Sequence, residues 1–181
     1  MFKRNFQAGF SLIELLVVIS IIGILAGILV LSFDTARKNS RDAARKSDLQ
    51  ALQLAIELYK AQNGTYPKEG CSAPTTLWVG PGPLSGWGQG NCDDYIEGLV
   101  PDYIASLPKD PNHELDQDLG YIYRTNIDRS AFKVIVHQSV ESQFITAQSD
   151  EFSRYPEICG ISVGNLRANE YSVYSPGVEC L

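Results

Sequence analysis

One apolar stretch dominates the chain: residues 10–33 read FSLIELLVVISIIGILAGILVLSF, with Glu14 as the only ionisable side chain. A helix of this length crosses the roughly 30 Å hydrocarbon core of a bilayer. A buried helix of a small soluble domain would show a polar face, and none is visible here. We therefore expect a membrane-embedded helix. Glu14 is a candidate functional residue, because a charge in hydrocarbon is costly and normally has a partner.

The residues before this stretch, MFKRNFQAG, contain Lys3 and Arg4 and end in Gly9. A secretory signal peptide is cut after its apolar region, where this chain reads LSFDTARKNS, a poor cleavage site. Cleavage is therefore expected before the apolar helix rather than after it.

Gly9 followed by FSLIE, residues 10–14, resembles the processing site of type IV pilins and of the related pseudopilins of type II secretion. The resemblance covers the leader, the long helix and, more loosely, residues 107–123. It implies cleavage between Gly9 and Phe10 by a membrane prepilin peptidase, and N-methylation of the new Phe10 amine. It also implies the type IV pilin fold, an α+β arrangement in which a long N-terminal helix packs against a small antiparallel sheet.

Glu14 has a physical reason to take part in assembly. Cleavage creates a positive amine on Phe10 at the edge of the hydrocarbon, and a carboxylate from an adjacent subunit neutralises it, since opposite charges attract strongly in a low dielectric. The alternative is that Glu14 snorkels or is protonated in an ordinary signal anchor.

The sequence predicts four parts: a leader at residues 1–9, a transmembrane and filament-core helix at 10–33, an amphipathic outer half of that helix at 34–62, and a globular head at 63–181. Loss of two positive charges with the leader takes the formal net charge from -6 to -8. Such an acidic chain is not expected to bind nucleic acid in general.

The outer half of the helix is expected to continue the apolar half without a break, because the first proline of the chain is Pro67. We expect one helix from about Ser11 to Gln62, ended by Asn63-Gly64. Four apolar residues recur at three- and four-residue spacing and form a face that needs a partner: Leu49, Leu52, Ile56 and Tyr59.

The helix carries two further features. Gly23 and Gly27 have the small-xxx-small spacing that lets helices approach closely, against the alternative that glycine is merely tolerated there. The second feature is a run of basic residues at positions 37–46. We interpret this basic run as a solvated helix face with local i,i+4 pairs, with lipid head groups or acidic filament surfaces as alternative partners. By the positive-inside rule this run favours the cytoplasm, but the cysteines and the leader outweigh it. Its members are Arg37, Lys38, Arg41, Arg45 and Lys46.

All four cysteines follow the helix, at Cys71, Cys92, Cys159 and Cys180. Thiols beyond the membrane are oxidised, so two disulfides are expected. Four cysteines allow three pairings, among which the sequence does not choose. Our preference is Cys71 with Cys92 and Cys159 with Cys180, because each bridge closes a nearby loop that contains glycine or proline. The spacing matches no zinc motif.

In the head, alternating residues 121–124 and 132–137, joined by 126–130, predict a β-hairpin whose one face covers the outer helix. A third strand near 143–146 would complete a minimal sheet, and the tail holds candidate short strands at 161–163 and 171–174. The glycine- and proline-rich segment between Cys71 and Cys92 reads as a loop. Its Trp78 and Trp87 are expected to pack onto their own head rather than to contact a subunit or a ligand.

An oxygen-rich run lies between the first predicted helix and the hairpin: Asp110, Asn112, Glu114, Asp116 and Asp118. The major pseudopilins that the N-terminus resembles often bind calcium near their C-terminal loops. The run lacks the EF-hand spacing, so solvated acids are preferred to a calcium site. The chain has only two histidines and no catalytic Cys/His or nucleophile arrangement, so neither a cofactor nor an enzymatic activity is expected.

The function that the sequence favours is a structural subunit of a type IV pilus-like filament, held in the inner membrane by one span and polymerised through its N-terminal helix with its head outside the cytoplasm. The expected partners are further copies of the chain, the prepilin peptidase and methyltransferase, an assembly platform and the membrane. Two disulfides and the missing calcium pattern favour a pilus. The alternatives are the major pseudopilin of a type II secretion system and an anchored binding domain that does not polymerise.

Overall fold

The computed structural model describes residues 10–74, 77–82, 84, 88–113, 119–147, 149, 151–154 and 168–176, with the backbone alone for residues 28–32. The chain divides into two compact units, residues 1–38 and 39–181. Among the helices of these described residues, none combines the length and the hydropathy that a membrane span needs. Membrane insertion of residues 10–33 stays a prediction.

One helix, α1, spans Leu12–Asn63 and contributes to both units. It ends at Gly64, whose φ of 80° lies in the left-handed region that glycine adopts without strain. The Gly64 amide donates to the carbonyl of Lys60 at 2.8 Å, and the Asn63 side-chain amide donates to the carbonyl of Tyr59 at 2.9 Å. The predicted single helix, including its stop at Asn63-Gly64, is confirmed.

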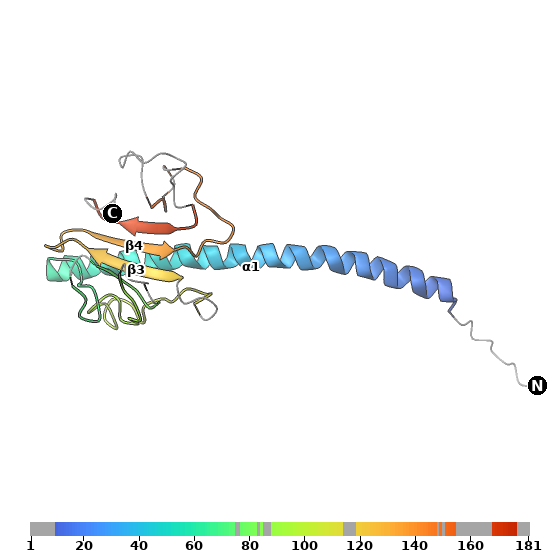
Figure 1. Cartoon of the computed structure of the whole chain (residues 1–181), viewed down its shortest axis with the longest axis horizontal. Helices are drawn as coiled ribbons and strands as arrows, with labels where there is room; N and C mark the ends of the chain where they lie inside the picture. Colours follow the sequence, from blue (N-terminus) through green and yellow to red (C-terminus); the bar gives the residue numbers. More distant parts are fainter. Residues whose placement is uncertain are drawn as a thin grey trace, which may run out of the picture. The chain divides into compact units, whose positions relative to one another are not determined.

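The second unit contains a five-stranded sheet in the order β2-β1-β3-β4-β5. The central hairpin pairs β3 with β4 in antiparallel register, with Ile122 opposite Ile135, and β5 adds to the free edge of β4 (Figure 1). Two-residue strands extend the other edge, where β1 pairs antiparallel with β3 and parallel with β2. The strand bounds are β1 Trp78–Val79, β2 Gly88–Gln89, β3 Gly120–Thr125, β4 Phe132–His137 and β5 Tyr171–Tyr174.

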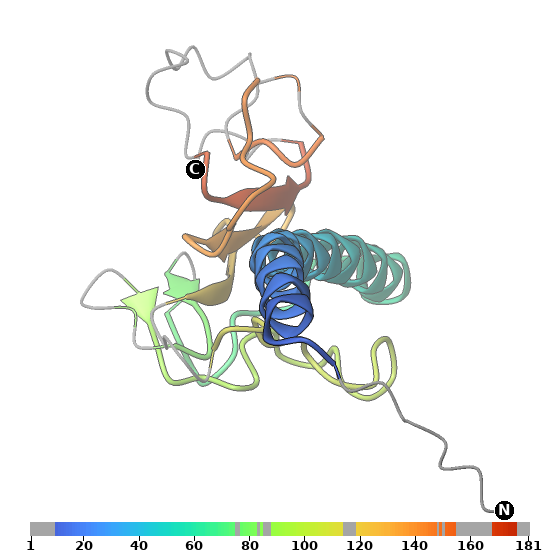
Figure 2. The ribbon, with the colours of Figure 1, turned by 90° about the vertical axis from the view of Figure 1, so that its right-hand side faces the viewer.

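The outer part of α1 lies along one face of this sheet, as the end-on view shows (Figure 2). Leu49, Leu52 and Ile56 are fully buried, and they join the side chains of alternate residues of the strands in one core. Because strand side chains alternate between faces, the residues that meet the helix are alternate ones within β3 and within β4. These are Tyr121, Tyr123, Phe132, Val134 and Val136. The predicted contact between the amphipathic helix face and the hairpin is therefore observed.

One predicted strand is wrong. Residues 143–146 form no strand, because their backbone groups are used elsewhere. The Gln143 amide donates to Asp42, the Gln143 carbonyl accepts from the Tyr171 hydroxyl, and the Ile145 amide donates to the carbonyl of Ala168. The third long partner in the sheet is β5, which coincides with the strand expected at 171–174; the one expected at 161–163 lies outside the described residues.

Cys71 and Cys92 form a disulfide with a Cα–Cα distance of 5.9 Å, which is the bridge preferred from the sequence. Cys159 and Cys180 lie outside the described residues, so their pairing stays a prediction. Within the loop that the bridge closes, Trp78 packs with Leu84, Ile122 and Ile135 in a small second core on the face of the sheet away from α1. Trp78 thus packs onto its own head as expected, and Trp87 is not described.

Candidate functional site

The first unit presents an apolar surface that no described residue of the chain covers. Every large apolar side chain that is described between Phe10 and Leu25 is exposed, from 48% at Val17 to 90% at Phe10. Contiguous exposed apolar patches of this kind normally mark a protein or membrane contact. The surface therefore fits lipid or the helices of other subunits.

Glu14 lies at the start of this surface and caps the helix. Its Oε2 accepts hydrogen bonds from the Ser11 amide and the Ser11 hydroxyl, both at 2.8 Å. The Ser11 hydroxyl oxygen accepts in return from the Glu14 amide at 3.3 Å. This reciprocal arrangement is a capping box, in which a serine and the glutamate three residues later satisfy the free amides of a helix N-terminus. The sequence interpretation missed this role, although the spacing Ser-x-x-Glu could have indicated it.

A hollow of about 380 Å³ brings Phe10 and Glu14 together on one side of the helix, with Ile13, Val17 and Val18 as its apolar walls. Gly9, the residue before the expected cleavage, lies outside the described residues. The arrangement places a carboxylate at an apolar surface beside the residue that cleavage would make the N-terminus.

Gly23 and Gly27 are not required by the contacts of the single chain. A Cβ built on either glycine meets no atom within 4 Å. The two glycines lie four residues apart on one face of α1. In the single chain, a larger side chain would fit at either position. Their spacing therefore remains an expectation for packing between helices and has no role in the fold of one chain.

The second unit contains a buried charge cluster that the sequence interpretation missed. Arg45 is fully buried, and its guanidinium holds both oxygens of Asp110 through Nε and Nη2, at 2.8 and 2.9 Å. Its Nη1 donates to Asp42 at 2.7 Å and to Glu141 at 2.9 Å. Burial opposes the charge of Arg45, but the hydrogen bonds and charge of Asp110 outweigh it and raise the pKa of the guanidinium. The cluster joins α1 to two loops of the head.

Asp42 holds the loop after β4, which contains Glu141, by binding the backbone of that loop. Its carboxylate accepts hydrogen bonds from three successive amides, those of Glu141, Ser142 and Gln143, at 2.8 to 3.2 Å. Burial raises the pKa of Asp42, but these backbone hydrogen bonds outweigh it, and the pKa lies below its ordinary value. The loop after β4 is therefore held by the helix side chain rather than by a strand partner.

Other members of the basic run also hold the head, so the interpretation of this run as a solvated face is wrong for three of its five residues. Arg41 Nε donates to Glu141 at 2.7 Å. Lys46 donates to the Gln143 side chain at 3.2 Å and lies over the Tyr171 ring at 4.8 Å. Lys38 shows the expected local i,i+4 pairing, with Asp34 at 2.8 Å.

The two described members of the oxygen-rich run are engaged within the protein. Asp110 binds Arg45, and the Asn112 side-chain amide donates to Glu141 at 3.0 Å. Residues 114–118 lie outside the described part, and among the described residues no three His, Cys, Asp or Glu side chains are grouped to hold a metal ion.

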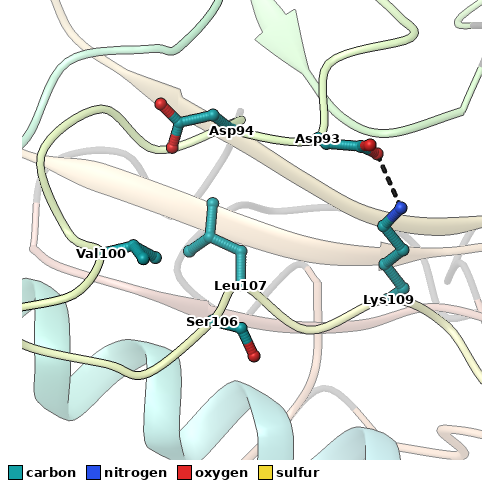
Figure 3. Close-up of a pocket in the computed structure, with 6 residues that line it drawn as sticks. All are labelled: Asp93, Asp94, Val100, Ser106, Leu107 and Lys109. Carbon is teal, nitrogen blue, oxygen red and sulfur yellow. Dashed lines mark ion pairs between the residues drawn. The ribbon is translucent and has the colours of Figure 1, made fainter.

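A pocket of about 420 Å³ lies in the loop between β2 and β3 (Figure 3). Val100 and Leu107 form its apolar wall, and Asp93, Asp94 and Lys109 lie at its rim. Lys109 pairs with Asp93 at 2.8 Å, as the dashed line shows (Figure 3). No sequence motif indicates this pocket.

Residues 4–30 match the family described as "Prokaryotic N-terminal methylation motif". The chain is 34% identical over 111 residues to the type II secretion system core protein G of Vibrio cholerae, covering 60% of this chain and 68% of that protein. It is 32% identical over 118 residues to the protein of that name from Pseudomonas aeruginosa, covering 60% and 81%. For that of Aeromonas hydrophila the identity is 35% over 115 residues, covering 60% and 70%. No solved structure is significantly similar to the chain.

These relatives favour the secretion pseudopilin, which the sequence left as the alternative, over the pilus subunit. The motif at the N-terminus, the long helix on a small sheet and these identities agree with one another. The chain belongs to the family of the type II secretion system core protein G, the pseudopilins.

Proposed function

We propose that this chain is the major structural subunit of a type II secretion pseudopilus. In this proposal a prepilin peptidase cuts between Gly9 and Phe10 and the new amine is methylated. The helix that begins at Phe10 is stored in the inner membrane and then packs with other copies in the filament core, while the head lies in the periplasm. The chain has a structural role and carries out no catalysis. The observation that carries the proposal is the bare apolar surface of residues 10–25 on a member of this family.

Glu14 can cap its own helix and bind a neighbour at the same time. Both bonds from Ser11 end on Oε2, so Oε1 is available to accept further hydrogen bonds. An ionised carboxylate has about four acceptor positions, and the capping box uses two. The positive amine of Phe10 on an adjacent subunit fits the remaining ones, and the apolar walls of the hollow strengthen that attraction by excluding water. Gly23 and Gly27 let the neighbouring helix approach closely.

The test is the intact mass and the N-terminal sequence of the protein purified from cells with an active prepilin peptidase and secretion system. We expect a chain that begins at N-methylated Phe10. The variant Glu14→Gln keeps the cleavage site but loses the charge, so we expect it to be processed and yet to be absent from filaments. The matched control is Asp34→Asn, which removes an exposed acid of the same helix and should assemble normally.

A chain that keeps Met1 in these cells contradicts the proposal, and so does a Glu14→Gln variant that assembles as well as Asp34→Asn. Deletion of the gene distinguishes a pseudopilin from a pilus subunit. A pseudopilin is needed for release of type II secretion substrates into the medium, whereas loss of surface fibres with normal secretion indicates a pilus subunit.

A further inference from the structure

The hairpin between β3 and β4 displays an apolar side chain at a rigid tip. Ile127 is 84% exposed, more than any other large apolar residue described in the second unit. Asn126 holds the tip from both ends: its amide donates to the Ala131 carbonyl, its Oδ1 accepts from the Ala131 amide at 2.9 Å, and its Nδ2 donates to the Ser130 hydroxyl at 2.8 Å. The exposure of Ile127 is therefore fixed by the fold.

A single exposed apolar side chain needs no explanation by itself. The second observation is the pocket in the loop between β2 and β3, whose apolar wall consists of Val100 and Leu107 (Figure 3). Its volume of about 420 Å³ accommodates a branched side chain with part of its backbone. Ile127 does not line this pocket, so the chain does not fill its own pocket with its own tip.

The charges around the tip and the pocket are complementary. Asp94 at the rim forms no ion pair within the described part of the chain, and Arg129 lies two residues beyond Ile127 on the hairpin. Arg129 likewise has no carboxylate partner among the described residues; its Nη1 lies 3.5 Å from the Tyr66 carbonyl. Asp128, which is exposed on the tip, and Lys109, at the rim, are also of opposite sign.

We propose that the hairpin tip of one copy docks into this pocket on a second copy, with Ile127 against Val100 and Leu107 and with Arg129 toward Asp94. The proposal rests on the polymerising function proposed above. Tip and pocket are different surfaces of one chain, so the contact is heterologous. Repetition of a contact of this kind that does not close into a ring gives an open helical filament. The heads would thereby add a specific contact to that of the helices.

The test uses full-length subunits assembled in cells. One subunit carries Ile127→Cys, a second carries Ser106→Cys at the pocket, and mild oxidation is followed by electrophoresis without reduction. We expect cross-linked dimers only when both variants are present. The matched control replaces the first variant by Leu54→Cys, an apolar residue that is also exposed, at 63%, but lies on α1. The hairpin pair should give clearly more dimer than the control pair, because docking of the tip brings positions 127 and 106 of two copies to the Cα separation of about 4.4–6.8 Å that a disulfide requires.

Charge exchange provides a second readout. Asp94→Arg and Arg129→Asp should each reduce the amount of filament, and the two changes combined should restore it, while thermal unfolding verifies that each variant is folded. Filaments that form normally but give no more dimer than the Leu54→Cys control overturn the docking proposal and leave the proposed function intact. Failure of the unsubstituted chain to form filaments overturns both.

Discussion

Replacement of Arg45 by methionine should destabilise the head severely at neutral pH. Arg45 is fully buried against Asp42 and Asp110, which are buried as well, and Glu141 contributes a third carboxylate. Methionine fills much of the same volume but leaves these carboxylates without their cation. Removal of one partner of a buried ion pair costs about 3–5 kcal/mol, because it leaves uncompensated charge in a low dielectric. A loss of that size is a large fraction of the stability of a typical domain.

The pH dependence of the loss has a definite sign. In the unsubstituted protein the pKa of Asp42 and that of Glu141 are held below their ordinary values, Asp42 by backbone hydrogen bonds against burial and Glu141 chiefly by Arg41. Their stabilisation is therefore present above the unfolded pKa values, about 4, and is lost as the pH falls through the folded values. In the variant, loss of Arg45 removes one of the interactions that lower the pKa of Glu141, so this carboxylate takes up its proton at a higher pH than in the unsubstituted folded protein. The difference in stability between the two proteins should narrow as the pH is lowered from 7 to 4.

The measurement is urea unfolding of the full-length protein in detergent at pH 7 and at pH 4, followed by tryptophan fluorescence. The control is Lys109→Met, which breaks the half-exposed pair with Asp93 and should cost less than about 1 kcal/mol. If Arg45→Met costs no more than Lys109→Met at pH 7, the cluster does not hold the loops to the helix. A difference that widens on acidification would refute the assignment of the charges.

Three further predictions concern the helix and the disulfide. Leu52→Ala should cost about 2–5 kcal/mol of unfolding free energy because Leu52 is fully buried, whereas Leu54→Ala on the exposed face should stay within about 0.5 kcal/mol; equal losses in denaturant titrations would disprove the packing. Replacing Cys71 and Cys92 by serine should cost about 3 kcal/mol, read from the thermal midpoint of unfolding, since the bridge closes a loop with a sequence separation of 21. Gly64→Ala should cost about 1 kcal/mol, because its left-handed backbone, and not lack of space, excludes a side chain; an unchanged melting temperature would contradict this.

The sequence predicts the main elements because each leaves a local, periodic signal. The length of α1 follows from the absence of proline before Pro67 and from Asn63-Gly64 at its end. The spacing of its buried leucines, at Leu49 and Leu52, predicts which face meets the sheet. The hairpin is likewise visible in the alternation of residues 132–137. These patterns depend on neighbours within one or two turns, which a sequence displays directly.

The charge cluster leaves no such signal, because its partners are far apart in the chain. Arg45 meets Asp110 at a sequence separation of 65, and Arg41 meets Glu141 at a separation of 100. A basic run on a helix looks the same whether it is solvated or paired with distant acids. The same cause explains the misplaced strand at 143–146, where the Gln143 amide donates to Asp42 and the Ile145 amide donates to the carbonyl of Ala168. Long-range polar contacts decide these details, and only the fold brings them together.

The disulfide of the head does not distinguish a pilus subunit from a pseudopilin. From the sequence, two disulfides favour a pilus, but the Cys71–Cys92 bridge closes the loop that carries β1 and β2, at the edge of the head sheet. A disulfide requires an oxidising compartment, and the periplasm provides one as well as the cell surface does. The bridge therefore reports on where the head folds and on the stability of one sheet edge. It contains no information about which filament the head belongs to, whereas the identity to the core protein G family does.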